Sequence, residues 1–356
     1  MRRKERQMIK EKVRELGIDL IDDGIAIRCT SPFSDSTVPL LIINQDNTFV
    51  DLSTGIKGDE EEFFRKLDVI SKPVYSLEPA EKKEESEDIK RYKEIMAAAW
   101  EFYTDQISKD HGDQAVKYLD TRGFETDGFG FTGKYVNSLY KHLIKSGYKK
   151  EDIFALKLAR EKEGKFYDTF IKRVMIPIRD SYGEIVAFGG RIIEDTSEYP
   201  KYVNSAESPI FSKRELLFGY DVARTAECNS YILCEGYMDV LSLHQAGFIN
   251  AVGSLGTALT EHQCTLMKNK QKVYVMYDGD EAGIQASIRA IPMLQGMGFL
   301  VKRIDLHDYK DPDEILKKKG RETFIERFKA SIDGTEYMLQ HLSKEKAVEY
   351  LCNIAM

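Results

Sequence analysis

Short β-like runs lie between helical stretches in the first part of the chain, residues 1–70. The apolar residues cluster in three runs separated by turn-forming residues, and a stretch with helical spacing flanks them on each side. The β-like runs span residues 24–28, 38–43 and 48–52, and the helical stretches span residues 5–16 and 59–67. We therefore predict a small α+β module at residues 1–70.

A segment with almost no apolar residues follows this module. Residues 71–90 contain Pro73 and Pro79 and then a run of charged residues from Glu81 to Asp88. Such a polar run cannot bury enough apolar surface to become part of a core, and proline interrupts regular structure. We interpret residues 71–90 as a solvated, charged linker.

Residues 91–228 combine helices with a predicted hairpin. Apolar residues recur at helical spacing across residues 92–107, and a second helix is predicted for residues 114–119. Residues 171–193 alternate apolar and polar on both sides of Gly183, which is typical of a β-hairpin. We predict a second α+β subdomain here.

Four apolar runs alternate with helical stretches in residues 229–320. The runs span residues 231–234, 251–255, 273–277 and 299–306. They do not alternate with polar residues, as is typical of strands that are buried on both faces of a parallel sheet. Thr260 and Gln263 have the spacing of a capping box at one helix start. We predict a parallel α/β sheet here, followed by a helical segment at residues 321–356.

Acidic residues follow three of these four runs. Glu235 follows the first run, Asp278 and Asp280 follow the third, and Asp311 and Asp313 follow the fourth. The carboxyl ends of parallel strands meet at one edge of the sheet, so we expect these carboxylates to lie together. They repel one another unless cations join them, and oxygen-only ligands favour Mg²⁺ or Mn²⁺. Any one acid alone would more simply cap a helix or face water, but the set predicts a metal site.

Composition limits the classes of protein that are compatible with the chain. Its 356 residues are 42% hydrophobic and 31% charged, with a net charge of −7. No run of about 18 apolar residues and no secretory signal is present, so we expect no membrane span and a cytoplasmic protein. The negative charge disfavours a surface that binds DNA throughout but permits a local basic groove. The five scattered cysteines lack Cys-x-x-Cys spacing and predict reduced thiols.

Several motifs resemble those of bacterial replicative DNA primases. Three of them match the Toprim domain, namely Glu235-Gly236-Tyr237-Met238-Asp239-Val240, Ser254-Leu255-Gly256-Thr257-Ala258-Leu259 and Asp278-Gly279-Asp280-Glu281-Ala282-Gly283. Topoisomerases and some nucleases also contain Toprim domains. Other motifs resemble the catalytic subdomain that precedes Toprim in primases, namely Arg173-Val174-Met175-Ile176-Pro177-Ile178-Arg179-Asp180, Phe188-Gly189-Gly190-Arg191, Lys201-Tyr202-Val203-Asn204-Ser205 and Pro209-Ile210-Phe211-Ser212-Lys213. The resemblance is strong over residues 91–330 and weaker over residues 1–70.

This resemblance implies a fold, an activity and a set of site residues. The implied fold is α/β, a parallel-sheet Toprim domain preceded by an α+β primase subdomain. The implied activity is template-directed synthesis of short RNA primers from ribonucleoside triphosphates on single-stranded DNA, by nucleotidyl transfer with two Mg²⁺ or Mn²⁺ ions. The implied catalytic residues are Glu235, Asp278 and Asp280, and the implied metal ligands are these three with Asp311 and Asp313. The residues implied to bind nucleotide or DNA are Arg122, Arg173, Arg191, Lys201, Asn204 and Lys213.

The N-terminal module departs from the family at its zinc site. Primases of this family begin with a zinc ribbon, and residues 29–67 are similar to that ribbon with its ligands replaced. Ser31, Ser34, Asp51 and Thr54 stand at the four ligand positions. Hydroxyl groups are poor zinc ligands, so we expect a degenerate ribbon that folds without zinc.

The C-terminal segment departs from the family as well. Residues 321–356 are too few for the helical domain with which these primases bind the replicative helicase. We therefore expect either a shortened primase or a phage or mobile-element variant that has a helicase as partner without the usual docking domain.

Two other functions are compatible with the sequence. The first is a binding protein that no longer makes primers but occupies single-stranded DNA or a replication partner, because the zinc ribbon that helps to recognise template is degenerate. The five retained acidic residues argue against it. The second is a Toprim nuclease, against which the primase-specific motifs argue.

Overall fold

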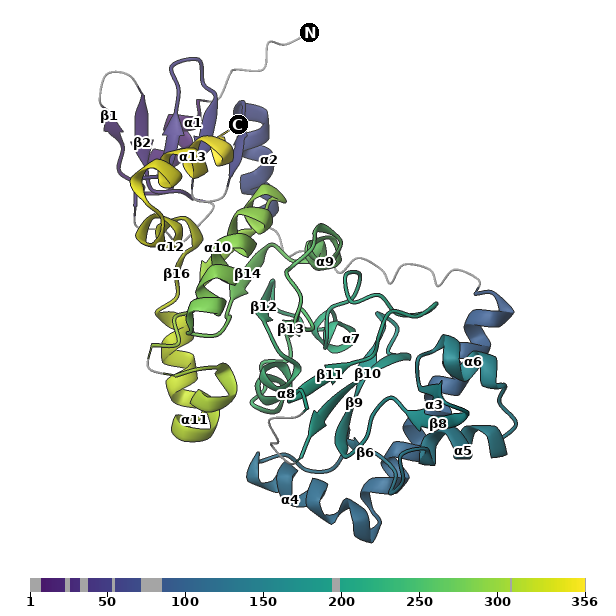
Figure 1. Ribbon diagram of the computed structural model, residues 1–356. Coiled ribbons are helices and arrows are strands. Elements are labelled where there is room, and N and C mark those ends of the chain that lie inside the picture. The colour runs from purple at the N-terminus through teal and green to yellow at the C-terminus, as the bar shows by residue number, and fades with distance from the viewer. Residues whose placement is uncertain are drawn as a thin grey trace. The chain divides into compact units, whose positions relative to one another are not determined.

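The structure is a computed structural model that describes residues 8–22, 26–32, 38–52, 55–71, 85–193, 199–307 and 309–355. The chain divides into two compact units (Figure 1). One unit combines Met1–Glu78 with Ala223–Met356, and the other is Pro79–Val222. Among the described residues, no helix is both long and apolar enough to cross a membrane.

The N-terminal part of the first unit is a five-stranded antiparallel meander. Its elements are α1 Ile9–Glu15, β1 Ile21–Asp22, β2 Ile27–Cys29, β3 Leu41–Ile43, β4 Phe49–Asp51, β5 Ile56–Gly58 and α2 Glu60–Ser71. Ile9 and Val13 of α1 and Phe63 of α2 are fully buried in its core, where the rings of Phe63 and Phe49 meet edge to face at 5.1 Å. The predicted mixture of short strands and flanking helices is thus present in the described residues.

The second part of this unit is a sheet with the strand order β13-β12-β14-β15-β16. Its strands are β12 Ser230–Cys234, β13 Ala251–Gly253, β14 Lys272–Val275, β15 Leu300–Arg303 and β16 Ile332–Asp333. The four strands that the apolar runs predicted are parallel, with Leu233 opposite both Val252 and Val275. Strand β16 pairs antiparallel with β15 and was not foreseen, because two residues carry no periodicity.

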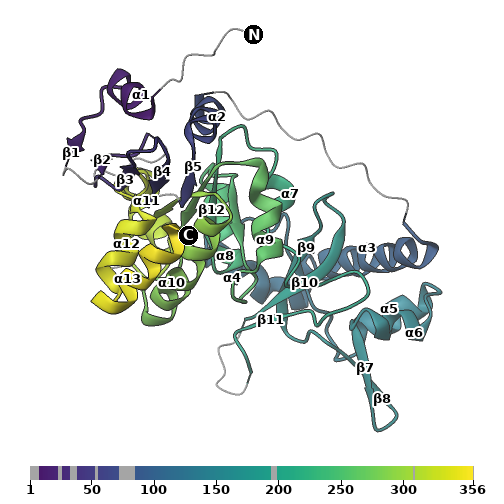
Figure 2. The ribbon, with the colours of Figure 1, turned by 90° about the horizontal axis from the view of Figure 1, so that it is seen from above.

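Helices cover both faces of this sheet. They are α8 Tyr237–Gln245, α9 Glu261–Leu266, α10 Glu281–Gly296, α11 Pro312–Lys329, α12 Gly334–His341 and α13 Lys344–Ala355. Crossovers between parallel strands are right-handed as a rule, and the chain leaves the β12–β14 pair in opposite directions, so α8 and α10 lie on opposite faces of the sheet. Helix α11 packs on α8, and α12 and α13 pack on α10, beside which Figure 2 shows them. The predicted capping box is present at α9, since the Thr260 hydroxyl accepts from the Gln263 N–H at 3.2 Å.

The second unit is built on a four-stranded antiparallel sheet with the order β11-β10-β9-β6. Its elements are α3 Glu87–Ile107, α4 Asp113–Thr121, β6 Gly130–Phe131, α5 Ser138–Lys145, α6 Lys150–Ala155, β7 Ala159–Lys162, β8 Lys165–Asp168, β9 Arg173–Arg179, β10 Ile185–Ile192, β11 Tyr202–Asn204 and α7 Tyr220–Ala223, the last of which crosses the boundary between the units. Strands β9 and β10 form the hairpin predicted around Gly183. Helix α3 packs on this sheet and buries Tyr103 against Phe188.

Helix α3 begins inside the segment that we interpreted as linker. The Ser86 hydroxyl accepts a hydrogen bond from the Ile89 N–H at 3.4 Å, and Glu87 and Asp88 occupy the first turn. Negative charge is stabilised at that end of a helix by the helix dipole, so this part of the charged run starts a helix. The linker interpretation is therefore wrong for residues 87–90, and residues 72–84 lie outside the described residues.

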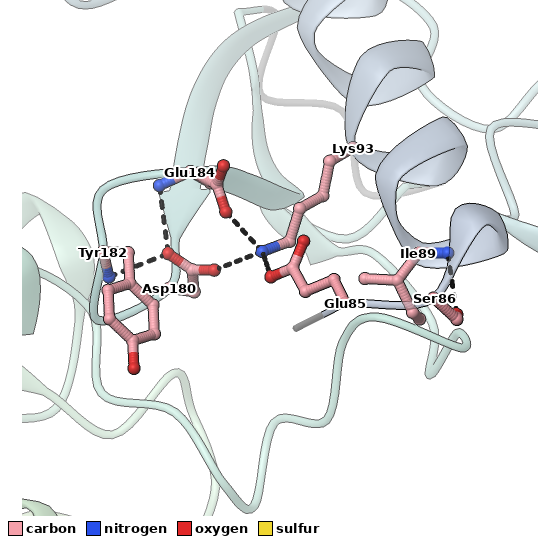
Figure 3. A network of polar contacts seen from close by, with 7 residues as sticks. All are labelled: Glu85, Ser86, Ile89, Lys93, Asp180, Tyr182 and Glu184. Atoms are coloured by element: carbon pink, nitrogen blue, oxygen red, sulfur yellow. Dashed lines mark hydrogen bonds and ion pairs between the residues drawn. The ribbon is translucent and has the colours of Figure 1, made fainter. Parts of the chain in front are cut away.

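A half-buried lysine, Lys93, joins the start of α3 to the β9–β10 turn (Figure 3). The Lys93 ammonium forms ion pairs with Glu85 at 2.6 Å, with Asp180 at 3.0 Å and with Glu184. Asp180 also accepts hydrogen bonds from the N–H groups of Tyr182 and Glu184, which closes the turn. A single cation of α3 thus joins Glu85, two residues before the helix, to the hairpin of the sheet on which α3 packs.

Candidate active site

Glu235 and Asp278 are joined by a hydrogen bond at the carboxyl edge of the parallel sheet. Glu235 directly follows β12, and Asp278 lies three residues beyond the end of β14. The Glu235 carboxylate accepts from the main-chain N–H of Asp278 at 3.2 Å. Both side chains are half-buried. The structure therefore brings together two of the three residues implied to be catalytic.

Asp280 and Asp311 cap the helices that begin at this edge. Asp280 accepts from the N–H of Gly283 at 3.0 Å at the start of α10, and Asp311 accepts from the N–H of Glu314 at 2.8 Å at the start of α11. Each carboxylate uses one oxygen in this way, and the other oxygen has no hydrogen bond to the described residues. Capping therefore leaves an oxygen of each acid available to a cation.

Gly283 is required for the close approach of α10 to the acidic residues. A Cβ atom at this position would lie 2.1 Å from the carbonyl oxygen of Asp278, which is a severe clash. At Gly279 a Cβ would lie 3.0 Å from the Tyr309 carbonyl oxygen, which is tight but less severe. The two glycines of this motif thus allow the chain to fold back beside the carboxylates.

Asp313 is placed differently from the other acids. It is 4% exposed, and its carboxylate forms an ion pair with Lys317 at 2.5 Å and accepts the hydroxyl hydrogen of Ser242. Its negative charge is therefore partly neutralised within the protein. Spacing along the chain does not show that Lys317, one helical turn later, reaches Asp313.

Asp239 is an acidic residue of this edge that the sequence reasoning did not single out. It lies in the first turn of α8, four residues after Glu235, and is 8% exposed. Burial raises its pKa well above the usual value, and the charges of Asp311, Asp278 and Asp313 raise it further. Its place in the first turn of the helix that follows the β12 strand and Glu235 was the signal that could have identified it.

Burial and mutual repulsion raise the pKa values of carboxylates at this edge. Burial raises the pKa of Asp278 to about 7, with further contributions from Glu235, Asp311 and Asp280. The pKa of Glu235 is also raised, first by burial and then by Asp280, although the hydrogen bond from Asp278 opposes the shift. Carboxylates that repel one another in a partly buried place form a site that a cation would stabilise.

The chemistry of these residues fits Mg²⁺ or Mn²⁺. Among the described residues, no three acidic, histidine or cysteine side chains hold a metal ion as they stand. The oxygens left over after capping nevertheless form an oxygen-only donor set, which these hard cations prefer. Coordination would need the side chains of Asp278, Asp280 and Asp311 to rotate toward a common point. Carboxylates turn easily about their side-chain bonds, so such a rotation is accessible.

The second unit carries the residues implied to bind nucleotide or DNA, and two of them are buried. Arg173 and Arg191 are 5% and 3% exposed. The Arg173 guanidinium donates to the carbonyls of Gly190, Pro200 and Lys201 at 3.1, 2.9 and 3.3 Å. Arg191 donates to the Lys201 carbonyl at 3.5 Å. Both arginines therefore fix the chain around Lys201, whose own side chain is exposed.

Arginine and tyrosine side chains alternate across this unit from α4 to β11. The Arg122 guanidinium lies over the Tyr118 ring at 5.7 Å from its centroid. Arg191 lies 5.5 Å from the centroid of the same ring and 5.1 Å from that of Tyr202. Tyr202 is 38% exposed, so this series of stacked cations and rings reaches solvent. Such contacts hold each cation and ring in a fixed orientation.

Asn204 and Lys213 complete the set in this unit. Asn204 lies on β11 opposite Gly189 of β10, and its side chain is half-buried. Lys213 is half-buried as well, and its main-chain N–H donates to the Glu207 carboxylate at 3.0 Å.

Two of the four positions at which the resemblance places zinc ligands, Ser31 and Asp51, lie among the described residues and are joined by a hydrogen bond. Ser31 and Asp51 are 4% and 0% exposed, and the Ser31 hydroxyl donates to the Asp51 carboxylate. Burial, together with Asp51, raises the pKa of the neighbouring Cys29 thiol to about 12. Ser34 and Thr54 lie outside the described residues.

Comparisons with known proteins cover residues of both units. Residues 102–224 match the family model of the N-terminal domain of the DNA primase catalytic core, and residues 232–316 match a Toprim-like model. The crystal structure of the zinc-binding and RNA polymerase domains of Aquifex aeolicus primase is similar over 97% of this chain and 88% of that one, with a TM-score of 0.66 and 29% identity. A structure of the DnaG primase catalytic domain bound to single-stranded DNA covers 72% of this chain and 84% of that one, with a TM-score of 0.64 and 30% identity.

Similarity to curated sequences points to the same family. The chain matches several curated DNA primases, of whose length it spans only 39–43%. The DNA primase of Aquifex aeolicus is 35% identical over 337 residues, which are 88% of this chain and 67% of that protein. The chain therefore belongs to the DNA primase family.

Proposed function

We propose that this chain synthesises short RNA primers on single-stranded DNA as a template-directed RNA polymerase. The observation that carries the proposal is the set of carboxylates at the carboxyl edge of the Toprim sheet. Burial and mutual repulsion raise the pKa of Asp278 to about 7 there, as at a site that is completed by cations. Membership of the DNA primase family supports this function over that of a nuclease or a binding protein.

The reaction would join the 3′-oxygen of the growing RNA to the α-phosphorus of the incoming ribonucleotide while the bond to pyrophosphate breaks. Mg²⁺ or Mn²⁺, when bound, would neutralise the charge that develops on the phosphates. Asp278, Asp280 and Asp311 would hold these ions with the oxygens that are not used in capping. Glu235, whose pKa is raised, can take the proton that the 3′-hydroxyl releases.

The second unit would bind the template and the nucleotide. The exposed ammonium of Lys201 has no ion-pair partner among the described residues, and phosphates are the anions that it would contact. The exposed ring of Tyr202 could stack with a base of single-stranded DNA. We propose Arg122, Asn204 and Lys213 as further contacts to the nucleic acid or nucleotide. Since the template and nucleotides are in the cytoplasm, we propose that location.

We also propose that the N-terminal module contains no structural zinc. The buried Ser31 hydroxyl and Asp51 carboxylate bond to each other, and the Cys29 thiol stays protonated at neutral pH because its pKa is raised to about 12. A zinc ion binds thiolates and neutral imidazoles, which the described residues do not offer here.

A primer-synthesis assay tests the proposed function. Purified protein is incubated with single-stranded DNA, labelled ribonucleotides and Mg²⁺ or Mn²⁺, and the products are separated by length. We expect short RNA from the unmodified protein and at least about a 100-fold loss from Asp280→Asn, because charge stabilisation at a reacting phosphate is worth at least that much. Glu281→Gln, at the next position of α10, is the matched control and should retain synthesis. Cut DNA would support a nuclease instead, and a gel shift without synthesis would support a binding protein.

A further inference from the structure

Arg303 is a buried arginine directly behind the candidate metal site. It is the last residue of β15 and is 3% exposed. The sequence around it gave no sign of a functional position. One of its terminal nitrogens donates to the Val275 carbonyl at 3.3 Å and to the Ile304 carbonyl, and the other donates to the Tyr277 carbonyl at 2.9 Å. The Tyr337 ring covers the guanidinium at 5.7 Å.

This guanidinium has no acidic partner in contact with it. Within the described part of the chain it forms no ion pair, and its Nε has no hydrogen-bond acceptor. A positive charge in such a place is strongly disfavoured unless negative charge lies near enough to compensate for it. The acidic residues at the edge of the sheet are the source of that charge.

One peptide group connects Arg303 to these acids. The carbonyl of the Tyr277–Asp278 peptide accepts from Arg303, and the N–H of the same peptide donates to Glu235 at 3.2 Å. Hydrogen bonds at the two ends of a peptide polarise it in the same direction and strengthen each other. The pKa of Glu235 is raised above all by burial, and the charge of Arg303 counteracts that rise.

We propose that Arg303 is the resident cation of the carboxylate site, a positioning residue that balances the charge of Glu235 and Asp278 when no divalent metal is bound. Through the shared peptide it also holds these two residues in register. The proposal rests on the metal site described above. It implies that a bound divalent ion takes over part of the role of Arg303.

Thermal unfolding with and without Mg²⁺ tests this exchange of charge. Arg303→Met should melt about 5 °C lower than the unmodified protein in EDTA, and Mg²⁺ should raise its melting temperature by at least about 2 °C more than it raises that of the unmodified protein. Arg303→Lys keeps the charge and should show a Mg²⁺-induced rise close to that of the unmodified protein. Ile291→Ala, a fully buried position on α10, is a packing control that should melt lower by the same amount in both conditions. A Mg²⁺-induced rise in Arg303→Met that is unchanged or smaller would overturn the proposal.

A double-mutant cycle in EDTA tests the coupling without metal. Asp278→Asn should raise the melting temperature of Arg303→Met more than that of the unmodified protein, because the lost cation leaves the carboxylate unbalanced. Equal effects in the two backgrounds would refute a charge-balancing role, and the cycle remains informative if Arg303→Met alone folds poorly. If Mg²⁺ stabilises none of the proteins, the metal site itself fails, and the cycle still decides the role of Arg303.

Discussion

Asp278 illustrates how a residue proposed to bind metal can lower the stability of the fold. Its carboxylate is half-buried beside Glu235, Asp280 and Asp311, and its pKa is raised to about 7. At pH 8 its ionised form therefore opposes folding in the absence of metal, since the unfolded chain ionises it freely. Removing this charge should relieve the opposition while it removes a proposed metal ligand.

Asp278→Asn should therefore separate stability from activity. We expect primer synthesis to fall at least about 100-fold, as at a lost metal ligand, and the melting temperature in EDTA at pH 8 to rise by about 2–4 °C. The stabilisation by Mg²⁺ should shrink at the same time. The primer-synthesis assay measures the loss of activity. Calorimetry in EDTA and in Mg²⁺ measures the two changes in melting temperature, and Glu281→Gln is the control for both assays. Full synthesis by the variant in Mg²⁺ would exclude Asp278 from the metal site.

The basic residues of the second unit should divide by exposure. Lys201→Ala should reduce the slope of the logarithm of the single-stranded DNA binding constant against the logarithm of salt concentration by about one. It should leave stability unchanged, because the Lys201 ammonium is exposed. Arg173→Met should instead reduce stability by about 2 kcal/mol, since it removes the buried hydrogen bond to the Gly190 carbonyl and two part-buried ones to the carbonyls of Pro200 and Lys201. Fluorescence anisotropy at several salt concentrations and urea unfolding measure the two quantities. Equal salt slopes for Lys201→Ala and the unmodified protein would place Lys201 away from the DNA.

At the scale of elements, the N-terminal sheet meets the C-terminal helices of the same unit (Figure 1). The Thr335 hydroxyl at the start of α12 donates to the Leu52 carbonyl just beyond β4 at 2.8 Å. Asp333 caps α12 by accepting from the Thr335 N–H at 2.8 Å. Burial raises the pKa of Asp333 to about 7, and Asp51 of β4 adds to the shift. This contact therefore depends on the protonation of a buried acid.

The contact should weaken as pH rises. The pKa of Asp333 is higher in the folded protein than its ordinary value of 3.8, so its stabilising effect is complete below about pH 4 and is lost as pH rises through 7. Asp333→Asn keeps an oxygen for the cap and carries no charge. At pH 8 we expect it to stabilise the protein by about 2 kcal/mol, and by less at pH 5. Urea unfolding at both pH values measures the difference, and a gain that is the same at both would contradict it.

The sequence predicted elements best where their pattern was long. The apolar runs around Leu233 and Val275 identified parallel strands, and the acidic residues at their ends gave the edge at which the candidate site lies. The start of α3 was misread because a charged run does not show that Ser86 caps a helix. Strand β16 and the partners of Asp313 could not be predicted in this way. They depend on contacts that form only in the folded chain, and a local sequence pattern does not contain them. Arg303 was missed for the same reason, since its acceptors lie on the neighbouring strand.

At the scale of the whole molecule, the N-terminal module belongs to the same compact unit as the Toprim sheet. Its core of Ile9, Val13, Phe49 and Phe63 is closed by Leu300 at the start of β15. So small a sheet is marginal alone, and zinc ribbons obtain much of their stability from the metal. Contact with the Toprim part supplies apolar burial that can replace that contribution here.

The module should therefore fold without zinc. We expect elemental analysis of the purified protein to find less than about 0.1 zinc per chain, because tetrahedral zinc sites need thiolate or imidazole ligands. Neither a chelator nor added zinc followed by dialysis should change the melting temperature or the circular dichroism of the protein. Stoichiometric zinc, or unfolding of the module on chelation, would contradict this prediction. Because Ser31 and Asp51 bond to each other inside the sheet, Asp51→Ala should instead destabilise the module by about 1–3 kcal/mol equally with and without chelator, which separates a buried hydrogen bond from a metal ligand.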